Sequence, residues 1–168
     1  EAPMHPYERD GQGVVPGEGA AIALLERTGG ETTAPPLGYL SGWARAGDSR
    51  HRLGWPTLTA SVTADPRTDS TGKLFAGGVR SIQQSIASAG LLPQQIGYVA
   101  GAGNGTSYDL LETATLRAAL GGHAEQVAIS SPIGLGGESL TSAGLRLGAA
   151  LSSLASSTLP GTSLCKPP

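Results

Sequence analysis

The sequence predicts an α/β layered fold in which helices cover a mixed sheet, and two observations support this prediction. Short apolar runs typical of strands, at residues 96–101 and 126–130, each lead through a glycine-rich loop into a stretch with helical spacing. Strands that alternate with helices are typical of layered α/β proteins. The 168 residues suffice for one domain, and an aromatic content of only 4% favours a core of Ala, Leu, Val and Ile.

The first third of the chain carries weaker signals. Residues 1–18 are rich in Gly, Pro and charge, and we expect a loop segment there. The run GAAIALLE at 19–26 predicts a short buried strand, although Ala and Leu leave a helix open, and residues 37–47 predict a second strand. Residues 46–73 show little periodicity and predict a long loop, which in a compact domain is often functional.

The middle of the chain is patterned more strongly. Residues 75–89 carry apolar side chains at helical spacing, and Gly90 stands where helices commonly end. We expect Asp109 to cap the next helix, with Glu112 three residues on as in a capping box, and Gly121 to end it.

The last third predicts one more helix after a turn. Residues 131–139 form a glycine-rich turn, and residues 140–156 predict a helix of small residues packed into the core. Residues 161–168 are expected to be a tail. Trp43 and Trp55 are expected in the core rather than at an interface.

Composition argues against several functions. The net charge of −2 does not favour binding to nucleic acid. The sequence contains no run of eighteen apolar residues, so no membrane span is expected. Residues 1–13 lack the features of a signal peptide, and the single Cys165 fits a reducing compartment, so we expect a cytoplasmic protein. His5, His51 and His123 show no metal-ligand spacing, and the last two are expected to be solvated.

The loop GAGNGT at 101–106 raises the main functional question. Loops between a strand and a helix are where α/β proteins place their sites. Its glycines do not have the spacing of a dinucleotide fingerprint, and no Gly-Lys-Ser/Thr follows, so nucleotide binding is not expected. Asn104 is expected in a left-handed or turn conformation. The run GLGG at 134–137 is expected to be a close-packing turn rather than an anion site.

Three segments in order resemble motifs of the β-ketoacyl synthases. They are YERDGQGVVPGEGAAIALLE at 7–26, AGLLPQQIGYVAGAGNGTSYDLLET at 89–113 and ISSPIGLGGESLTSAG at 129–144. The resemblance covers nearly all of this chain but less than half of a family member. It implies a thiolase-like α/β fold, here roughly its C-terminal half, with residues 1–168 as one ketosynthase-like domain.

The resemblance also implies which positions would serve catalysis. The family joins acyl units by decarboxylative condensation, with a cysteine nucleophile in its N-terminal half and two histidines and a lysine in its C-terminal half. The first histidine matches Ala102, the lysine matches Ile133 and the second histidine matches Glu138. The nucleophile's segment has no match, and Cys165 lies beyond the last helix. The candidate substrate-pocket positions are Gly103, Asn104, Gly105, Thr106, Asp109 and Glu112. For Asp109 and Glu112 we prefer a structural role, satisfying amides at the helix start.

A site of this kind must stabilise the enolate that forms as carbon dioxide leaves, which requires hydrogen-bond donors or positive charge. The Ala102 side chain offers no donor, and an ionised Glu138 has the wrong sign. At a separation of about 4 Å and an effective dielectric near 20, like charges cost roughly 4 kcal/mol, or about three decades in rate. A protonated Glu138 could instead donate a hydrogen bond.

The resemblance therefore implies a non-catalytic ketosynthase-like subunit in fatty acid or polyketide assembly, similar to chain-length-factor partners. Its partner would be a ketosynthase-type subunit in a heterodimer, with an acyl carrier protein as a further partner and its phosphopantetheine thioester as the ligand. No cofactor or metal is expected. The alternatives are an acyltransferase active only with a nucleophile-bearing partner half, an acyl or carrier-protein binding module, and a truncated remnant.

Overall fold

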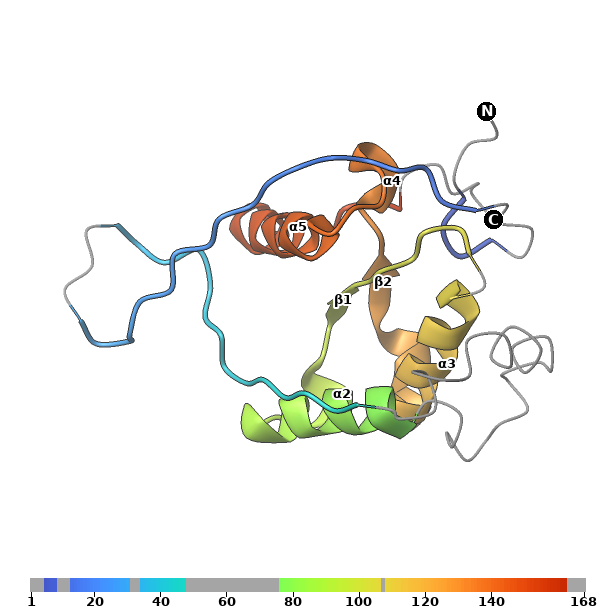
Figure 1. The fold of residues 1–168 in the computed structure, drawn as a ribbon. Helices are drawn as coiled ribbons and strands as arrows, with labels where there is room; N and C mark the ends of the chain where they lie inside the picture. The colour runs from blue at the N-terminus through green and yellow to red at the C-terminus, as the bar shows by residue number, and fades with distance from the viewer. Residues whose placement is uncertain (1–4, 9–12, 31–33, 48–75, 107, 163–168) are drawn as a thin grey trace.

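The computed structural model describes residues 5–8, 13–30, 34–47, 76–106 and 108–162 (Figure 1). In chain order its elements are α2 Ala76–Ser88, η4 Pro93–Gln95, β1 Tyr98–Ala100, α3 Tyr108–Leu120, η5 Gly121–Gln126, β2 Ala128–Ser130, α4 Ile133–Gly136 and α5 Ser142–Ser156. The strands β1 and β2 run parallel, with Val99 opposite Ile129. The expected alternation of strands and helices is therefore present, in a small parallel sheet.

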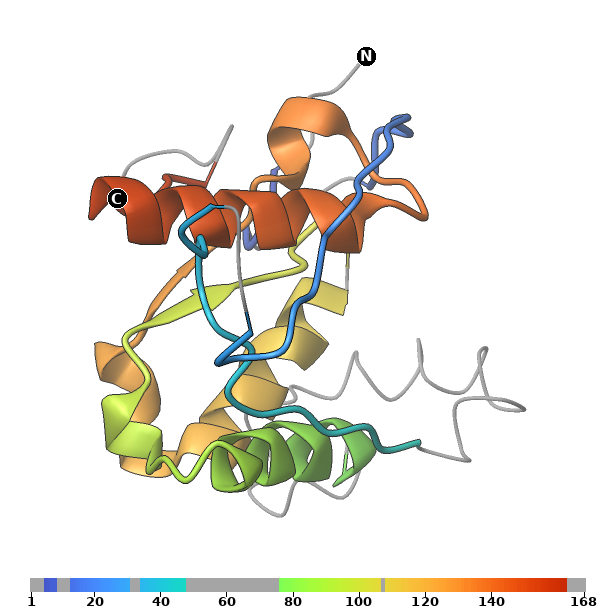
Figure 2. The same ribbon diagram turned by 90° about the vertical axis from the view of Figure 1, so that its left-hand side faces the viewer.

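The elements form three layers, with this sheet in the middle. Figures 1 and 2 show α5 on one side of β1 and β2, and α2 and α3 on the other. Ala114, Ala119 and Leu120 of α3 are buried. Covering both faces of a parallel sheet with helices is the usual arrangement, because a crossover between parallel strands places a helix on a face.

Glycines end two of the helices as the sequence predicts. Gly90 has a φ of 69° and its N–H donates to the carbonyl of Ala87 over 2.9 Å, so it ends the turn that follows α2. Gly121 has a φ of 59° and follows the last residue of α3. Both angles lie in the left-handed region, where a residue without a Cβ has no steric penalty.

The two strands predicted near the N-terminus are wrong. Residues 19–26 and 37–47 are extended but belong to no strand, and most of their side chains are exposed, with Ile22 fully so. A strand needs a neighbour to share its hydrogen bonds, and among the described residues neither segment has one. Trp43 is 69% exposed, so its expected core position is also wrong. Trp55 and most of the predicted 46–73 loop lie outside the described residues.

Within the residues that the structure describes, no helix is both long and apolar enough to cross a bilayer.

Candidate functional site

Two glycine-rich loops meet at the carboxyl end of the sheet. The first follows β1, and its Gly101 N–H donates to the Ser130 carbonyl over 2.8 Å. The second follows β2, and the Ser131 hydroxyl donates to the Gly103 carbonyl over 2.6 Å. Because the strands are parallel, their carboxyl ends lie at the same edge, and these bonds hold the two loops side by side.

Asp109, in the first turn of α3, organises the first loop. The residue is 4% exposed, and its Oδ1 accepts the N–H of Asn104 over 2.8 Å. Its Oδ2 accepts two more N–H groups, from Gly105 over 2.9 Å and from Tyr7 over 2.8 Å. The carboxylate thus satisfies three backbone donors, two in the glycine-rich loop and one at Tyr7.

Glu112, one turn later, holds the start of the same loop. Its two carboxylate oxygens accept the Ala102 N–H over 2.8 and 3.1 Å. The expected capping box is therefore wrong, because both carboxylates reach back to loop amides rather than to the first amides of the helix. The amide of Tyr108, the first residue of α3, donates instead to Oγ1 of Thr106 over 3.3 Å.

Tyr7 completes this arrangement from the far end of the sequence. Its hydroxyl donates to Oε2 of Glu112 over 2.8 Å and accepts the Gly103 N–H over 3.2 Å. A Cβ at Gly103 would lie 2.5 Å from Cζ of the tyrosine ring, so the ring needs glycine there. Burial raises the pKa of the Tyr7 hydroxyl far above its usual range, and the negative charge of Glu112 raises it further.

Sequence reasoning missed Tyr7. The signal that could have found it is the pair of glycines at 101 and 103, because alternate glycines mark a place where a large group approaches the backbone closely. Local pattern cannot say which residue approaches, because the partner is 96 positions away.

Asn104 links the first loop to the second. Its side-chain Oδ1 accepts the Thr106 N–H over 3.2 Å, which forms the expected turn. The left-handed conformation falls on the next residue, Gly105, with a φ of 79°. The Nδ2 amide of Asn104 donates to Oε2 of Glu138 over 3.1 Å and so ties together the loops after β1 and β2.

Glu138 is also held through its backbone. Its N–H donates to the Val15 carbonyl over 2.8 Å, and its carbonyl accepts the Gly17 N–H over 2.9 Å. A Cβ at Gly17 would lie 2.8 Å from Cα of Gly137, so the N-terminal segment crosses this loop at close range. The loop contains the short helix α4 and the left-handed Gly137, with a φ of 74°, which agrees with the expected close-packing turn.

Ala102 and Ile133 differ in their surroundings. Ala102 is exposed, and its backbone N–H is already paired with Glu112. Ile133 is 1% exposed and belongs to the buried core, where its amide donates to the Ser131 hydroxyl over 3.4 Å. Neither side chain carries a group that can donate a hydrogen bond or transfer a proton.

His123 does not join this site. A ring nitrogen lies 3.0 Å from the Ile96 carbonyl, which is before β1, at the opposite end of that strand from Ala102. The side chain is half-buried, so the expectation that it is solvated is wrong. His51 lies outside the described residues. The part of the chain that the structure describes contains no group of three His, Cys, Asp or Glu residues able to hold a metal ion.

The chemistry available at the first loop follows from these bonds. The amides of Ala102, Asn104 and Gly105 all donate to the chain's own carboxylates. A phosphate would have to displace Asp109 or Glu112 to reach them, so the loop is not organised to receive an anion. These bonds give the two acidic residues a structural role in the loop, not at the helix start where it was expected.

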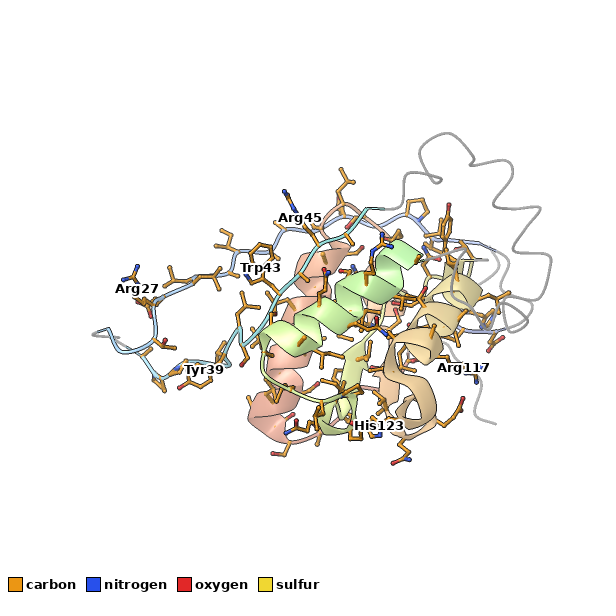
Figure 3. All side chains as sticks on the ribbon, turned by 90° about the horizontal axis from the view of Figure 1, so that it is seen from below. Arg27, Tyr39, Trp43, Arg45, Arg117 and His123 are labelled. Carbon is orange, nitrogen blue, oxygen red and sulfur yellow. The ribbon has the colours of Figure 1, made fainter. Side chains whose placement is uncertain are left out.

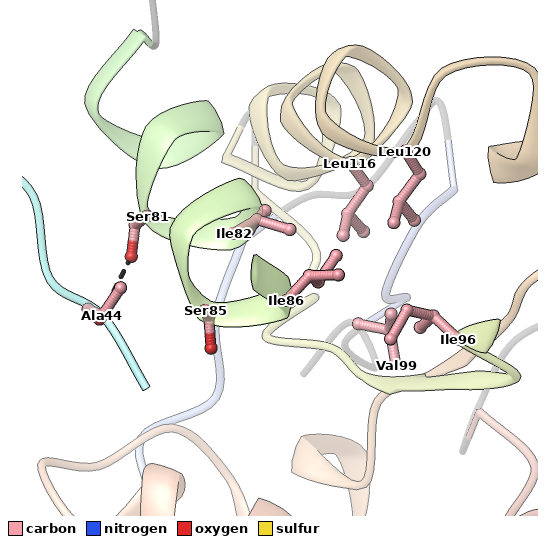
Figure 4. A pocket seen from close by; sticks show the side chains of 9 residues that line it. All are labelled: Ala44, Ser81, Ile82, Ser85, Ile86, Ile96, Val99, Leu116 and Leu120. Atoms are coloured by element: carbon pink, nitrogen blue, oxygen red, sulfur yellow. Dashed lines mark hydrogen bonds between the residues drawn. The ribbon is translucent and has the colours of Figure 1, made fainter. Parts of the chain in front are cut away.

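A separate cavity of about 240 Å³ lies between α2, α3 and β1 (Figure 4). Its walls come mainly from aliphatic side chains such as Ile82, Val99 and Leu116, and none of the described residues that line it is ionisable. The Ser81 hydroxyl donates to the Ala44 carbonyl over 3.4 Å at one side. The described residues thus give the cavity an apolar wall.

Comparison with known proteins identifies the family of this chain. The chain matches the family described as beta-ketoacyl synthase, C-terminal domain, over residues 59–165. It is 30% identical over 167 residues to 3-oxoacyl-[acyl-carrier-protein] synthase 2 of Synechocystis sp., an alignment that covers 95% of this chain and 36% of that protein. It is 29% identical over 150 residues to the protein of that name from Rhizobium meliloti, covering 86% of this chain and 31% of the relative.

A third relative of that name, from Coxiella burnetii, is 26% identical to this chain over 147 residues, and the alignment covers 32% of that protein. The chain therefore spans about a third of the length of the curated relatives it matches. The small parallel sheet between helices agrees with this assignment. From the matched domain and the motifs on both loops, the chain belongs to the β-ketoacyl synthase family and carries its C-terminal domain.

Proposed function

We propose that this chain is a non-catalytic β-ketoacyl synthase-like subunit that serves fatty acid or polyketide assembly through an active ketosynthase. The observation that supports the proposal is the type of residue at three positions. Where the family motifs carry two histidines and a lysine, this chain has Ala102, Glu138 and Ile133.

The surroundings of these residues support a lost site rather than a repaired one. A methyl group replaces the first imidazole, and the amide behind it is already paired with Glu112. Buried Ile133 places an aliphatic side chain where the family has a charge. Glu138 brings a carboxylate to a place that needs a donor, and an ionised carboxylate about 4 Å from an enolate costs roughly 4 kcal/mol.

A partner role follows from what such a chain can still do. It keeps the hydrogen-bonded loop scaffold, and its relatives are named for acyl carrier protein chemistry. We propose a ketosynthase-type subunit and an acyl carrier protein as partners, a chain-length-type role in a heterodimer, and a cytoplasmic location. The positions around 103–106 would then shape an acyl pocket without transferring a proton.

The test is to mix the full chain with the intact Synechocystis synthase and follow malonyl-thioester decarboxylation and product chain length. The chain alone should decarboxylate at the background rate, the two proteins should co-elute, and the distribution of products should shift. Decarboxylation by the chain alone above background would refute the proposal. So would separate elution together with unchanged products.

A second candidate is an acyltransferase that works only when another polypeptide supplies the nucleophile, and the Asn104 amide beside Glu138 favours it by providing one donor at the site. The test adds this chain to the Synechocystis synthase shortened by the segment that aligns with it. Decarboxylation by the pair, reduced at least tenfold by Glu138→Gln or Asn104→Ala, would support this candidate. No rate above background, or a rate insensitive to both substitutions, would eliminate it.

A further inference from the structure

We infer that Asn104 is a deamidation site that the folded loop keeps closed, and that its reaction releases the link between the loops after β1 and β2. Asn104 is the only asparagine in the 168 residues, and Gly105 follows it directly. Asparagine before glycine deamidates more readily than before other residues, because glycine has no Cβ to hinder the approach of its backbone nitrogen to the asparagine side chain. The inference does not depend on the proposed function.

The reaction needs water as its only co-reactant. The Gly105 nitrogen loses its proton and forms a bond to Cγ of Asn104, while the bond from Cγ to Nδ2 breaks. The side-chain nitrogen leaves as ammonia, and a succinimide ring remains in the chain. Water then opens this ring at either carbonyl, which yields aspartate or isoaspartate at position 104.

The proton that must leave Gly105 is held by Asp109. The Gly105 N–H donates to Oδ2 of Asp109 over 2.9 Å, and both residues are buried. Hydroxide from solvent does not reach a buried N–H, and the carboxylate beside it disfavours a further negative charge on the nitrogen. The folded loop therefore suppresses the first step of the reaction.

The side-chain amide that must be attacked is held at both ends. Oδ1 of Asn104 accepts the Thr106 hydroxyl over 2.6 Å and the Thr106 N–H over 3.2 Å. Nδ2 donates to Oε2 of Glu138 over 3.1 Å. Any movement of Cγ breaks at least one of these bonds, so the loop must open locally before the ring can form.

The product would change the contact between the two loops. Aspartate at position 104 has no N–H to donate, and it brings a second carboxylate to Glu138, so that a hydrogen bond is replaced by repulsion. Isoaspartate has a larger effect, because the main chain then passes through the former side chain and gains one carbon. That extra carbon would move the Gly105 amide away from Asp109. A single opening of the loop would thus leave a permanent chemical change.

The experiment follows the amide at position 104 by peptide mass spectrometry. The full chain is incubated at neutral pH both folded and in urea, and trypsin then releases residues 81–117 as one peptide, because Arg80 and Arg117 flank the asparagine. Chromatography separates its aspartate and isoaspartate forms. Conversion should be at least about tenfold slower in the folded chain than in the unfolded chain.

Substitutions distinguish opening of the loop from unfolding of the domain. Thr106→Val removes one donor to Asn104 and should speed conversion in the folded chain about three- to tenfold, which corresponds to one hydrogen bond. Thr115→Val is the matched control, because its hydroxyl donates to a carbonyl within α3, and it should have no effect. Arg45→Gln, at an exposed arginine that points away from α2 in Figure 3, is a surface control. Ala119→Gly destabilises a buried part of α3 without touching the loop and should also leave the rate unchanged.

A separate measurement tests the effect of the product. Asn104→Asp should lower the urea concentration at which the chain unfolds, because it brings two carboxylates together. Adding Glu138→Gln should recover at least about half of this loss, since glutamine can donate to the new carboxylate. An equal loss in both backgrounds would refute the proposed release of the two loops.

Three results would overturn the closed site. An unfolded chain that keeps its amide would show that position 104 does not deamidate. A folded chain that converts as fast as the unfolded one would show that the hydrogen bonds of the loop give no protection. Equal acceleration by Ala119→Gly and Thr106→Val would show that unfolding of the whole domain, and not local opening of the loop, controls the reaction.

Discussion

The hydroxyl of Tyr7 donates a 2.8 Å hydrogen bond to Oε2 of Glu112, although 105 positions separate the two residues. With the bond from the Tyr7 N–H to Asp109, it fastens the start of the described chain to the first turns of α3. The loop of residues 101–105 lies between these two anchors.

Removing the hydroxyl in Tyr7→Phe should lower the free energy of unfolding by about 1–2 kcal/mol, because Glu112 loses a donor and the Gly103 amide loses an acceptor. Urea denaturation measures the change. Tyr39→Phe, at an exposed tyrosine, is the matched control and should change the stability by less than about 0.5 kcal/mol. Equal effects of the two substitutions would show that the Tyr7 hydroxyl has no special role.

The same hydroxyl should make the domain sensitive to alkali. Burial and Glu112 raise the pKa of Tyr7 in the folded protein. A group whose pKa is raised by folding contributes stability that is fully present below its unfolded pKa, near ~10 for tyrosine, and that is lost as the pH rises above it. Chemical denaturation between about pH 8 and about pH 11.5 should therefore show that the free energy of unfolding falls more steeply with pH for the native chain than for Tyr7→Phe. Parallel curves would rule out this linkage.

Asp109→Asn should cost about 3 kcal/mol, because one amide oxygen replaces two carboxylate oxygens that accept three N–H groups, and the new NH₂ faces donors. Thermal unfolding would report the loss. Glu125→Gln is the control, since Glu125 forms an exposed ion pair with Arg117 Nε at 2.9 Å, and its cost should stay below about 1 kcal/mol. A small effect at Asp109 would mean that the loop does not depend on its carboxylate.

Gly103→Ala should destabilise the domain by about 2 kcal/mol, because the added methyl meets the Tyr7 ring. In a Tyr7→Ala background the same change should cost much less, and a double-mutant cycle measures the coupling. Gly122→Ala, where nothing lies within 4 Å of an added Cβ, is the control. Additive effects of the two substitutions would disprove the close contact.

Ile133→Lys, which introduces the residue type that the resemblance implies for this position, should cost at least about 3 kcal/mol because it buries an uncompensated charge. Ile133→Val tests the site without a charge and should cost about 1 kcal/mol. Leu140→Lys, at a fully exposed position, should be close to neutral. Thermal unfolding of all three variants distinguishes them, and tolerance of Ile133→Lys would indicate a polar pocket at this position.

The parts of the fold that the sequence predicted are those set by local pattern. Helical spacing and a following glycine located α2 and α3, and the short apolar runs located β1 and β2, because each signal depends on residues within a few positions of one another. The same reasoning failed for residues 19–26 and 37–47, since strand formation depends on a distant neighbour that no local pattern reveals.

The bonds of the two acidic residues differ from those that the sequence predicts. Asp109 and Glu112 were expected to satisfy amides at the helix start, and they accept amides of the preceding loop instead. A capping box and a loop anchor use the same residue types at the same spacing, and only the path of the loop decides between them. Where Asn104 meets Glu138, the contact depends on two loops from different strands and has no signature in either.

Because α3 anchors the first loop, the position of that loop depends on the position of the helix. Because the carboxylates of Asp109 and Glu112 accept hydrogen bonds from three loop amides directly, a small rotation of α3 would move Ala102 and Asn104 with it. The pull would pass through the Asn104 amide to Glu138 in the neighbouring loop. A protein that pressed on the outer face of α3 could thereby reshape both loops without touching them.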